Sequence, residues 1–593
     1  MTWCHVLTLL VSCSLLPVSS EPILNFSDDR KLSLQTSNTV LKSSAISILG
    51  SSTTYYQQVS QARELIIGGS CDKGLKFINE ALNYFADDGD LWLLKGICLQ
   101  KLARHKEAVS PLIKALELGF TPWDAQQHQN PNDIMIRIAA SFAQLGNTEQ
   151  AVKWLKLGIK QRYDDRLGIA KLAEFDSLKA NEDFKKLALI MDTQDLSRVQ
   201  GWQLDLALLA EQVNQLHIDP DQSISEERLI HLLVEIEQSI PELTDQQILA
   251  HIDLFIGALG GGHDLFWPVS AKKGALMPFA LKVYWFNDGL YIIDAYDPSL
   301  IGSKIEYFNH TSANDAYIKV AKAFPGDNDM HARWMSARHL TQAYTLEVLG
   351  IVDDANDIKL TIVDEHNRRR QVIPKRKPFT PMSPALKAQD SGKIPLYLSQ
   401  LDNEYWLKLL PEISALYVQL NEVGNKGNDE ESLQAFAKRM GQTARSSQAK
   451  HLILDLRHSH GGNGYLLPHL LRELIAFETL SSQHKLYVII GRNTFSASQN
   501  LITDLDWISD PIFVGEPSGS RPNAPSESGQ LYLPYSGARG LLSSQFHQHS
   551  WPEDHRIWIA PDIPVALTSK AYFAGKDPAM DAISKLITLT NKQ

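Results

Sequence analysis

The stretch "LYVIIGRNTFSASQN" at residues 486–500 joins an apolar run to a group of small polar residues. The run "LYVII" at 486–490 is typical of a buried strand, whereas "LITDLDWI" at 501–508 has its apolar residues at helical spacing. Ser496 therefore lies where a strand turns into a helix. A serine at such a junction is either the N-cap of the helix or a nucleophile held at the positive helix end.

Further apolar runs of the same kind surround this one. They alternate with helical stretches, and near-continuous apolar strands between helices indicate a sheet that is covered on both faces. The C-terminal part of the chain is therefore expected to be an α/β domain. The expected strands are "ALYVQLN" at 415–421, "HLILDLR" at 451–457, "KLYVIIG" at 485–491 and "PIFVGE" at 511–516.

Unusual polar segments follow three of these strands, at the edge where α/β sheets place their ligands. "HSHGGNG" at 458–464 contains Gly461 and Gly462, whose backbone N–H groups could face a developing negative charge. Ser496 follows the next strand, and the tight turn "PSGSRPN" at 517–523 follows the last. A nucleophile, an oxyanion hole and a base that converge on one place are what acyl transfer requires.

The order of four segments resembles the tail-specific, or C-terminal processing, serine proteases, in particular the branch with the tricorn core and the chlamydial secreted protease. "GALGGGHD" at 257–264, "LYVQLNEV" at 416–423 and "YFAGKDPAMDAI" at 572–583 share this resemblance, which covers roughly residues 200–590. It implies a crotonase-like ββα spiral in the α/β domain, preceded by a PDZ-like module. The four segments are "LDLRHSHGGNG" at 454–464, "GRNTFSASQN" at 491–500, "VGEPSGSRPN" at 514–523 and "IWIAPDIPV" at 557–565.

The resemblance assigns roles to individual residues. It makes Ser496 the nucleophile and forms the oxyanion hole from the backbone N–H of Ala497 with that of Gly461 or Gly462.

The general base differs between the branches of this family. The processing proteases proper use a lysine about 25 residues after the serine, but that position is Arg521 here. Arginine remains protonated, so it cannot take a proton from Ser496. The other branch supplies a histidine from the N-terminal side, and His263 stands at that place. Its ordinary pKa lies close to neutrality, which suits a group that must accept and return a proton.

A third group should orient the imidazole. The resemblance points to Asp554 in "PEDHRIW", although family members often carry glutamate there. Glu553, Glu516 and Glu527 are alternatives.

The segment at 458–460 raises two further questions. Ser459 stands where asparagine is common in the family, which could loosen the oxyanion loop. His458 and His460 flank it, but two histidines at i, i+2 without a carboxylate or cysteine partner indicate no metal site. The expected reaction needs neither a metal nor a cofactor.

The first twenty residues, 1–20, have an apolar core followed by small residues, which predicts a signal peptide cleaved before Glu21. A buried N-terminal helix is the alternative, and lipidation at Cys13 is a weaker one. No later apolar run is long enough to span a bilayer, so an extracytoplasmic location, periplasmic or secreted, is expected.

Residues 55–165 contain a repeat. Gly74 and Ala108 are 34 residues apart, and Ala151 follows after the same period plus nine inserted residues. A 34-residue period is typical of tetratricopeptide repeats, which bind protein partners, whereas an arbitrary helical bundle is the alternative. Small residues also recur seven positions after and twelve positions before these three sites, at Ala81, Ala115, Gly158, Ala62, Gly96 and Ala139.

Composition excludes some classes of partner. The 593-residue chain has a formal net charge of −11 and no basic block longer than "RRR" at 368–370, so nucleic acid is not an expected partner. After removal of a signal peptide only Cys71 and Cys98 would remain, either as a pair or, as favoured here, as buried thiols.

The sequence thus predicts a multidomain protein that acts on polypeptides. The expected parts are a signal peptide at 1–20, tetratricopeptide-like helical repeats at 21–195, a helical subdomain at 196–272, a PDZ-like β-rich module at 273–380 and an α/β serine protease domain at 381–593. The expected function is an extracytoplasmic serine peptidase. The alternative is a non-catalytic binding or scaffold protein on the same fold, because retinoid-binding proteins of the interphotoreceptor matrix also resemble this family.

Overall fold

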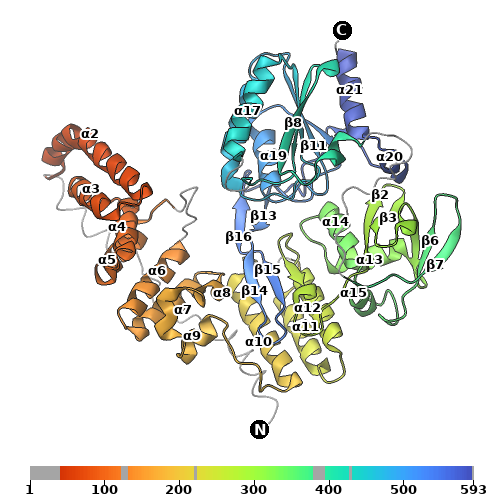
Figure 1. Ribbon diagram of the computed structural model, residues 1–593, viewed down its shortest axis with the longest axis horizontal. Helices are drawn as coiled ribbons and strands as arrows, with labels where there is room; N and C mark the ends of the chain where they lie inside the picture. The colour runs from red at the N-terminus through yellow and green to blue at the C-terminus, as the bar shows by residue number, and fades with distance from the viewer. Residues whose placement is uncertain (1–39, 122–130, 220–222, 378–393, 427–430, 591–593) are drawn as a thin grey trace. The chain divides into compact units, whose positions relative to one another are not determined.

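The computed structural model describes residues 40–121, 131–219, 223–377, 394–426 and 431–590 (Figure 1). The signal peptide predicted at 1–20, with Cys13, lies outside these residues. The chain divides into two compact units, Met1–Asp192 and Thr193–Gln593. None of the described helices combines the length and the apolar character that crossing a membrane requires.

The first unit is helical. Its neighbouring helices pack in pairs, and the small residues that recur in the sequence are buried where the helices meet. A Cβ at Gly96 would lie 2.5 Å from Leu112 Cδ2, so the close approach of two helices requires glycine there. Cys71 and Cys98 are buried, unpaired thiols. The helices are α2 (Val40–Ile67), α3 (Cys71–Tyr84), α4 (Gly89–Lys101), α5 (His105–Leu118), α6 (Pro131–Gln144), α7 (Thr148–Lys160), α8 (Arg166–Ile169) and α9 (Glu182–Leu187).

The second unit begins with three helices, α10 (Arg198–Leu216), α11 (Glu226–Ser239) and α12 (Asp245–Ala258). The sequence predicts a capping box at the start of α12, and the structure confirms it: Thr244 and Gln247 satisfy each other's backbone N–H groups. The apolar faces of the three helices form one core. The glycine turn that contains His263 directly follows α12.

An antiparallel sheet follows, in the order β2-β3-β4-β6-β7, with β5 (Thr311–Ser312) beside β4. The runs "LKVYWF" at 281–286, "GLYIIDAY" at 289–296 and "IKLTIVDE" at 358–365 predict short strands, with one helical stretch between them. Three helices stand there instead, and their apolar side chains cover the sheet. The strands are β2 (Leu281–Phe286), β3 (Gly289–Ala295), β4 (Lys304–Phe308), β6 (Leu360–Val363) and β7 (Arg369–Val372), and the helices are α13 (Ala313–Ala323), α14 (Asp329–His339) and α15 (Ala343–Val348).

The α/β prediction is confirmed by a six-stranded sheet in the order β17-β12-β11-β10-β9-β8, parallel except at the β8 edge. Helices α17, α18 and α19 pack against one face and α21 against the other, which is why the strands are apolar on both sides (Figure 1). The strands are β8 (Tyr405–Leu410), β9 (Ala415–Leu420), β10 (His451–Asp455), β11 (Lys485–Ile490), β12 (Ile512–Gly515) and β17 (Ile563–Pro564). The helices are α17 (Leu433–Ser446), α18 (Leu467–Glu478), α19 (Ala497–Ile508) and α21 (Pro578–Thr590).

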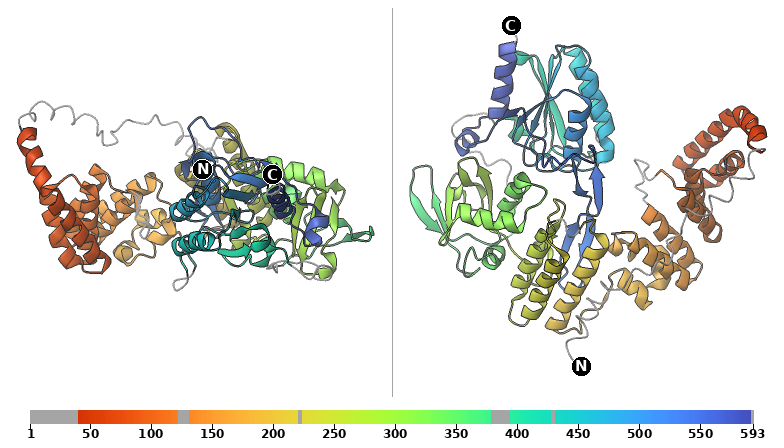
Figure 2. Two further views of the ribbon diagram at one scale, coloured as in Figure 1. Left: turned by 90° about the horizontal axis from the view of Figure 1, so that it is seen from above. Right: turned by 180° about the vertical axis from the view of Figure 1, so that it is seen from behind.

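A β excursion between β12 and β17 reaches back to the helices of residues 198–258. Strands β14 and β15 lie beside these helices in Figure 1 and in the right-hand view of Figure 2, and they share a core with them. Strand β15 also pairs with β1, which directly follows His263. The excursion therefore ties the His263 turn to the α/β domain. Its strands are β13 (Asn523–Ser526), β14 (Gly529–Tyr532), β15 (Arg539–Leu542) and β16 (Gln545–Gln548), and their partner is β1 (Leu265–Trp267).

Tyr535, at the tip of this excursion, is buried against α10. Its ring packs edge-on to Trp202 at a centroid distance of 5.7 Å, and a Cβ at Gly201 would lie only 2.1 Å from it. Asp205 fixes the same turn by accepting hydrogen bonds from the N–H groups of Tyr535 and Ser536 at 2.9 and 2.8 Å. The turn is thus held by both packing and hydrogen bonds.

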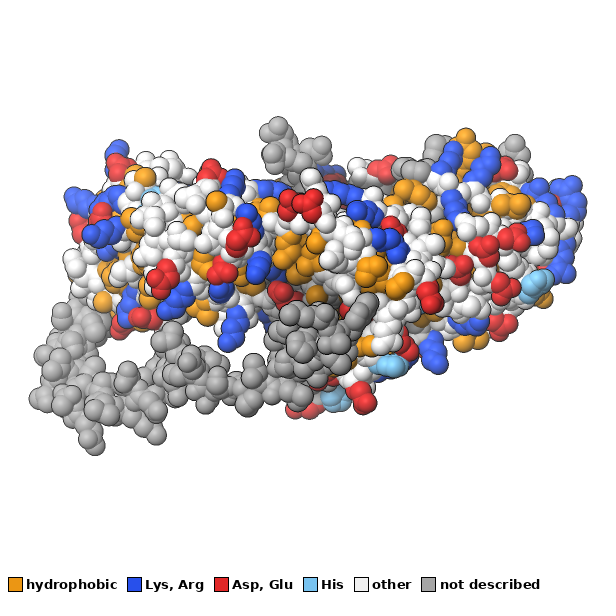
Figure 3. Space-filling view, turned by 90° about the horizontal axis from the view of Figure 1, so that it is seen from below, with side chains coloured by type: hydrophobic (Ala, Val, Ile, Leu, Met, Phe, Trp, Pro, Cys, Tyr) orange, Lys and Arg blue, Asp and Glu red, His pale blue; other side chains and the backbone are white. Residues whose placement is uncertain are grey.

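The exposed surface carries both signs of charge. On the face shown in Figure 3, acidic and basic side chains are interspersed among apolar ones. This distribution fits the modest net charge of −11.

We expect Tyr535→Ala to lower the free energy of unfolding by about 3–5 kcal/mol, because it removes a buried aromatic ring and leaves a cavity beside Trp202. Urea unfolding followed by circular dichroism measures the change. Tyr465→Ala, which truncates an exposed tyrosine, is the matched control and should cost much less. Equal losses in the two variants would contradict the role given to Tyr535.

Candidate active site

Ser496 immediately precedes α19, at the carboxyl end of β11. Its backbone has φ 53° and ψ −127°, a conformation that residues with a side chain rarely adopt. Its side chain makes no capping hydrogen bond to the helix. Ser496 thus occupies the N-cap position without capping the helix through its side chain, and strain of this kind in a non-glycine residue is typical of functional positions.

The turn that holds Ser496 is tied to the loop after β10. Thr494 Oγ1 accepts a hydrogen bond from the Gly491 N–H and donates one to the Leu456 carbonyl, both at 3.0 Å. The Phe495 N–H donates to the Ser459 carbonyl at 3.2 Å. Because β10 and β11 are parallel neighbours, their two loops leave the sheet at the same edge.

His263 meets Ser496 although the two residues are 233 positions apart. The distance from His263 Nε2 to Ser496 Oγ is 3.0 Å, a hydrogen bond, and the imidazole is 7% exposed. The structure thus brings together the two side chains that the sequence motifs single out.

The His263 turn is fixed by the carboxylate of Asp264. This buried group accepts hydrogen bonds from the N–H groups of Gly261 and Ser543, both at 2.8 Å. It also accepts one from His217 Nε2 at 3.0 Å. His217 Nδ1 accepts from the Asp219 N–H, so Nε2 is the nitrogen that carries the proton.

Aromatic side chains enclose the imidazole. The ring of Phe495, the residue before the serine, lies 4.5 Å from the His263 ring, centroid to centroid. Phe495 also contacts His331 and Trp334, both on α14. These contacts shield the His263–Ser496 pair from water on this side.

Burial lowers the pKa of His263 below its ordinary value. The nearby carboxylate of Asp327 acts in the opposite direction, and among the surrounding charges its effect is the largest. His263 is therefore neutral at neutral pH and able to accept a proton. Its Nδ1 is buried and has no hydrogen-bond partner among the described residues.

The backbone of the Gly461 loop and the nitrogen of Ala497 lie close to the serine. Gly461, with φ +97°, approaches so closely that a Cβ there would be 2.6 Å from Ser496 Cβ and 2.7 Å from the Ala497 nitrogen. Val423 fixes this loop by donating to the Gly461 carbonyl and accepting from the Asn463 N–H, both at 2.7 Å. In the described part of the chain, the N–H groups of Gly461, Gly462 and Ala497 have no protein acceptor.

Ser459 does not loosen this loop, contrary to expectation. It is fully buried, and its hydroxyl forms a 2.6 Å hydrogen bond with the hydroxyl of Ser498 on α19. Serine thus connects the oxyanion loop to the helix that follows the nucleophile. His458 and His460 diverge: the first stacks on Tyr397 and the second on Trp334.

Asp554, expected to orient His263, is engaged elsewhere. Its carboxylate accepts hydrogen bonds from Ser550 Oγ at 2.6 Å and from Arg556 Nη2 at 2.8 Å. The Arg556 guanidinium holds the pKa of Asp554 well below its usual range. No hydrogen bond links Asp554 to His263 in the described part of the chain, and a guanidinium two residues further on takes up its charge.

The alternative glutamates differ in where they lie. Glu516 forms an ion pair with Arg492 at 2.6 Å, and Glu553 is exposed. Glu527 Oε1 lies 3.2 Å from His547 Nε2, and its charge partly offsets the lowering of the His263 pKa by burial.

Asp327 is the carboxylate that sequence reasoning missed. Its Oδ1 accepts a hydrogen bond from the Gly262 N–H at 2.7 Å, directly beside His263, and its Oδ2 accepts from Ser520 Oγ. Arg521, the residue at the position of the family's lysine, donates to the Asp327 carbonyl. Asp327 stands in "PGDND" at 325–329, a turn typical of loops, and nothing in that pattern indicates a neighbouring histidine.

No protein-family model and no curated protein matches the chain. Solved structures do. The structure of mature CPAF complexed with lactacystin has a TM-score of 0.47 and 12% identity, and the match covers 67% of this chain and 99% of that one. The photosystem II D1 C-terminal processing protease has a TM-score of 0.33 and 12% identity over 66% of this chain and 98% of that one. The tricorn protease has a TM-score of 0.29 and 13% identity over 65% of this chain and 37% of that one.

These structural neighbours include the C-terminal processing and tricorn proteases that the ordered motifs of this chain resemble. Each of the three TM-scores is below 0.5.

The pH dependence of Ser496 reactivity should follow His263. Because the pKa of His263 is lowered by burial, we expect the rate of reaction with a fluorophosphonate to reach half its maximum below pH 6.5. Stopped reactions between pH 4.5 and 9, with circular dichroism to verify folding, give the profile. A midpoint above pH 7 would contradict a buried, neutral His263 acting as the base.

Proposed function

We propose that this protein is a serine peptidase in which Ser496 is the nucleophile and His263 the general base. The observation that carries this proposal is the 3.0 Å hydrogen bond between His263 Nε2 and Ser496 Oγ, next to backbone N–H groups that have no acceptor among the described residues. The nucleophile, the base and the Gly461 part of the oxyanion hole then come from three different loops, and Ala497 beside the nucleophile adds a second N–H group.

The acylation step follows from these positions. Ser496 Oγ attacks the carbonyl carbon of a peptide bond while His263 Nε2 takes up the hydroxyl proton. The carbonyl oxygen becomes an oxyanion, and it accepts hydrogen bonds from the N–H of Ala497 and from that of Gly461 or Gly462. Ala497 is the first residue of α19, so the positive helix end adds to this stabilisation.

His263 then reverses its role. The imidazolium donates its proton to the leaving amine, the C–N bond breaks, and the acyl group remains on Ser496. A water molecule attacks this ester while His263 accepts a proton from it. Return of the proton to Ser496 Oγ releases the new carboxyl end and restores the enzyme. His263 accepts and then returns each transferred proton, and the cycle uses no cofactor or metal.

We infer that Asp327, in place of Asp554, is the positioning carboxylate. It holds the backbone of Gly262, the residue before His263, and its negative charge favours the imidazolium that forms during the reaction. An orienting carboxylate of this kind acts through the histidine and does not itself take up a proton.

The remaining parts of the chain would then deliver substrate. We propose that the helical first unit is a tetratricopeptide-like array that engages a protein partner, and that residues 273–380 form a PDZ-like module for polypeptide. We also propose that residues 381–593 have a crotonase-like topology. The same proposal includes a periplasmic or secreted location after cleavage of residues 1–20. A purely non-catalytic scaffold would not require the strained backbone conformation of Ser496.

We expect purified protein to react with a fluorophosphonate and to cleave an unfolded polypeptide such as casein. Ser496→Ala should abolish both, because it removes the nucleophile. His263→Ala should lower the rate by about three orders of magnitude or more, as loss of a triad member does. In-gel fluorescence and peptide release measure the two activities. Equal labelling of Ser496→Ala would reject the nucleophile, and full activity of His263→Ala would reject the base.

Asp327→Asn tests the positioning role against the role first expected for Asp554. The asparagine oxygen can still accept from the Gly262 N–H, but the negative charge is lost. We expect the rate to fall by about tenfold or more and the pH midpoint to move to lower pH, because the imidazolium loses a stabilising charge. Asp554→Asn is the matched control and should keep its rate and midpoint. The opposite pattern would restore the assignment to Asp554.

A further inference from the structure

An exposed apolar patch lies on the second unit at the C-terminal end of α19. Trp507 and Trp551 are 58% and 60% exposed, and their rings meet edge to face with centroids 5.3 Å apart. Ile508, next to Trp507 in the chain, and Ile557 are exposed as well. Apolar patches with polar rims mark docking surfaces, and tryptophan is enriched in protein interfaces. The patch is therefore a candidate interaction surface.

A surface pocket of about 700 Å³, the α19 pocket, adjoins this patch. It lies between the end of α19, the start of β12 and the segment 555–562. Asp506, which lines it, directly precedes Trp507, and the Asp554 N–H donates to the Trp551 carbonyl at 2.9 Å. The patch and the pocket thus form one continuous surface. The apolar residues that line the pocket are Pro511, Phe513, Ile557, Trp558, Ile559 and Ala560.

The α19 pocket carries a surplus of negative charge. Its lining contains one guanidinium, that of Arg556, and three carboxylates, those of Asp506, Asp510 and Asp562. Arg556 binds both Asp506 and Asp554 at 2.8 Å, so two carboxylates share its single charge. In the described part of the chain no cation forms an ion pair with Asp510 or Asp562, and both are exposed.

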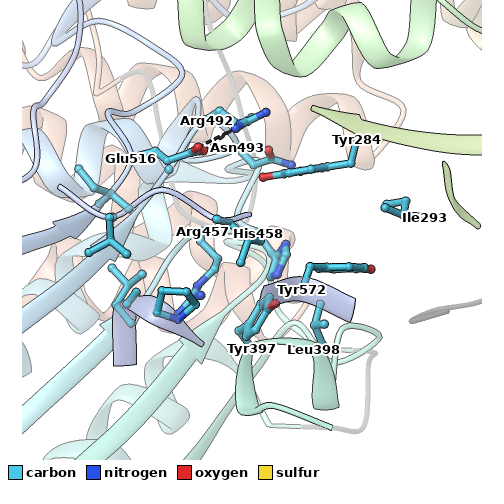
Figure 4. Close-up of a pocket in the computed structure, with 18 of the residues that line it drawn as sticks. Tyr284, Ile293, Tyr397, Leu398, Arg457, His458, Arg492, Asn493, Glu516 and Tyr572 are labelled. Carbon is cyan, nitrogen blue, oxygen red and sulfur yellow. Dashed lines mark hydrogen bonds and ion pairs between the residues drawn. The ribbon is translucent and has the colours of Figure 1, made fainter. Parts of the chain in front are cut away.

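The cavity at the carboxyl ends of β10 and β11 differs in this respect (Figure 4). The short helices α16 (Leu396–Ser399) and α20 (Ser569–Phe573) contribute to its walls. Figure 4 shows Arg492 beside Glu516, and the two form an ion pair at 2.6 Å. Carboxylates are not in surplus there, so a cationic partner favours the α19 pocket. The charged residues that line the cavity are Lys282, Arg457, Arg492, Asp294 and Glu516.

The charge of the α19 pocket favours one kind of partner. In a two-fold contact with a second copy, the same acidic pocket would face itself, and like charges repel. Nucleic acids and anionic membrane surfaces are repelled for the same reason. A lysine or arginine side chain is attracted by the carboxylates and by the faces of the tryptophan rings. Apolar side chains beside it match the apolar lining of the pocket.

We propose that the α19 pocket and the Trp507–Trp551 pair bind a basic segment of another polypeptide, one in which lysine or arginine stands beside apolar residues. The basic side chains lie against the two tryptophans and near Asp510, and the apolar ones enter the pocket. The proposal concerns binding alone and does not rest on the chemistry proposed for Ser496. Asp506 stands ten residues after Ser496, which corresponds to about 15 Å along a helix.

Fluorescence anisotropy measures binding to the full chain carrying Ser496→Ala, so that no probe is cleaved. The probes are three decapeptides with an uncharged dye and a central pair of leucines, which is flanked on both sides by lysine, by glutamine or by glutamate. We expect the lysine probe to bind saturably and about tenfold more tightly than the glutamine probe, with the glutamate probe weakest. Raising the salt concentration from about 50 to about 300 mM should reduce this difference, because salt screens exposed charges.

Two variants locate the site. Asp510→Asn keeps the shape of the side chain but removes its charge, so the preference for lysine over glutamine should fall about threefold. Trp507→Ala should weaken binding of both probes by about tenfold, because apolar contact is lost as well. Asp353→Asn and Tyr56→Ala change exposed residues elsewhere and should alter neither value. Circular dichroism verifies folding, and Asp510→Asn provides the test should Trp507→Ala not fold.

Four results would each overturn the proposal. The first is the absence of saturable binding of the lysine probe, and the second is equal or tighter binding of the glutamate probe. The third is an unchanged affinity in both Asp510→Asn and Trp507→Ala, which would place the binding elsewhere on the chain. The fourth comes from sedimentation velocity: a dimer that Trp507→Ala dissociates would assign the patch to a second copy of this chain.

Discussion

The hydrogen bond between His263 and Ser496 is the interaction on which the candidate site depends. His263 follows α12 and Ser496 precedes α19, so the two residues belong to different elements and their meeting requires a link between these elements. The link between them is the β excursion, in which β15 pairs with β1 while Tyr535 and the turn around it dock on α10. The packing of Tyr535 on α10, remote from the reacting atoms, therefore helps to determine whether the His263 imidazole reaches the Ser496 hydroxyl.

Burial and charge then set what this pair can do. Phe495 and the surrounding residues exclude water, which keeps His263 neutral, while Asp327 favours the charged form that must appear during proton transfer. The two effects oppose each other, and that opposition suits a base that must also act as an acid.

Much of this arrangement could be predicted from the sequence, for identifiable reasons. The strands at 415–421, 451–457, 485–491 and 511–516 were recognisable because parallel strands buried on both faces are apolar throughout. Ser496 and His263 were recognisable because the motifs that contain them, in their order along the chain, resemble those of a known protease family. The β excursion was not, since its strands are short and pair with a three-residue strand almost 280 positions away. Asp327 was missed for the same reason: its relation to His263 arises only through tertiary structure. Asp554 was chosen by its spacing from Ser496, and spacing does not reveal that Arg556 already binds it.

A crystal structure of the protein after reaction with a fluorophosphonate tests the central claim most directly. The account predicts a phosphonyl group on Ser496 Oγ, with one of its oxygens about 2.7–3.1 Å from the N–H groups of Ala497 and of Gly461 or Gly462. It also predicts that His263 Nε2 remains within hydrogen-bonding distance of the modified Ser496. An adduct on another residue, or an imidazole of His263 turned away from a modified Ser496, would contradict it.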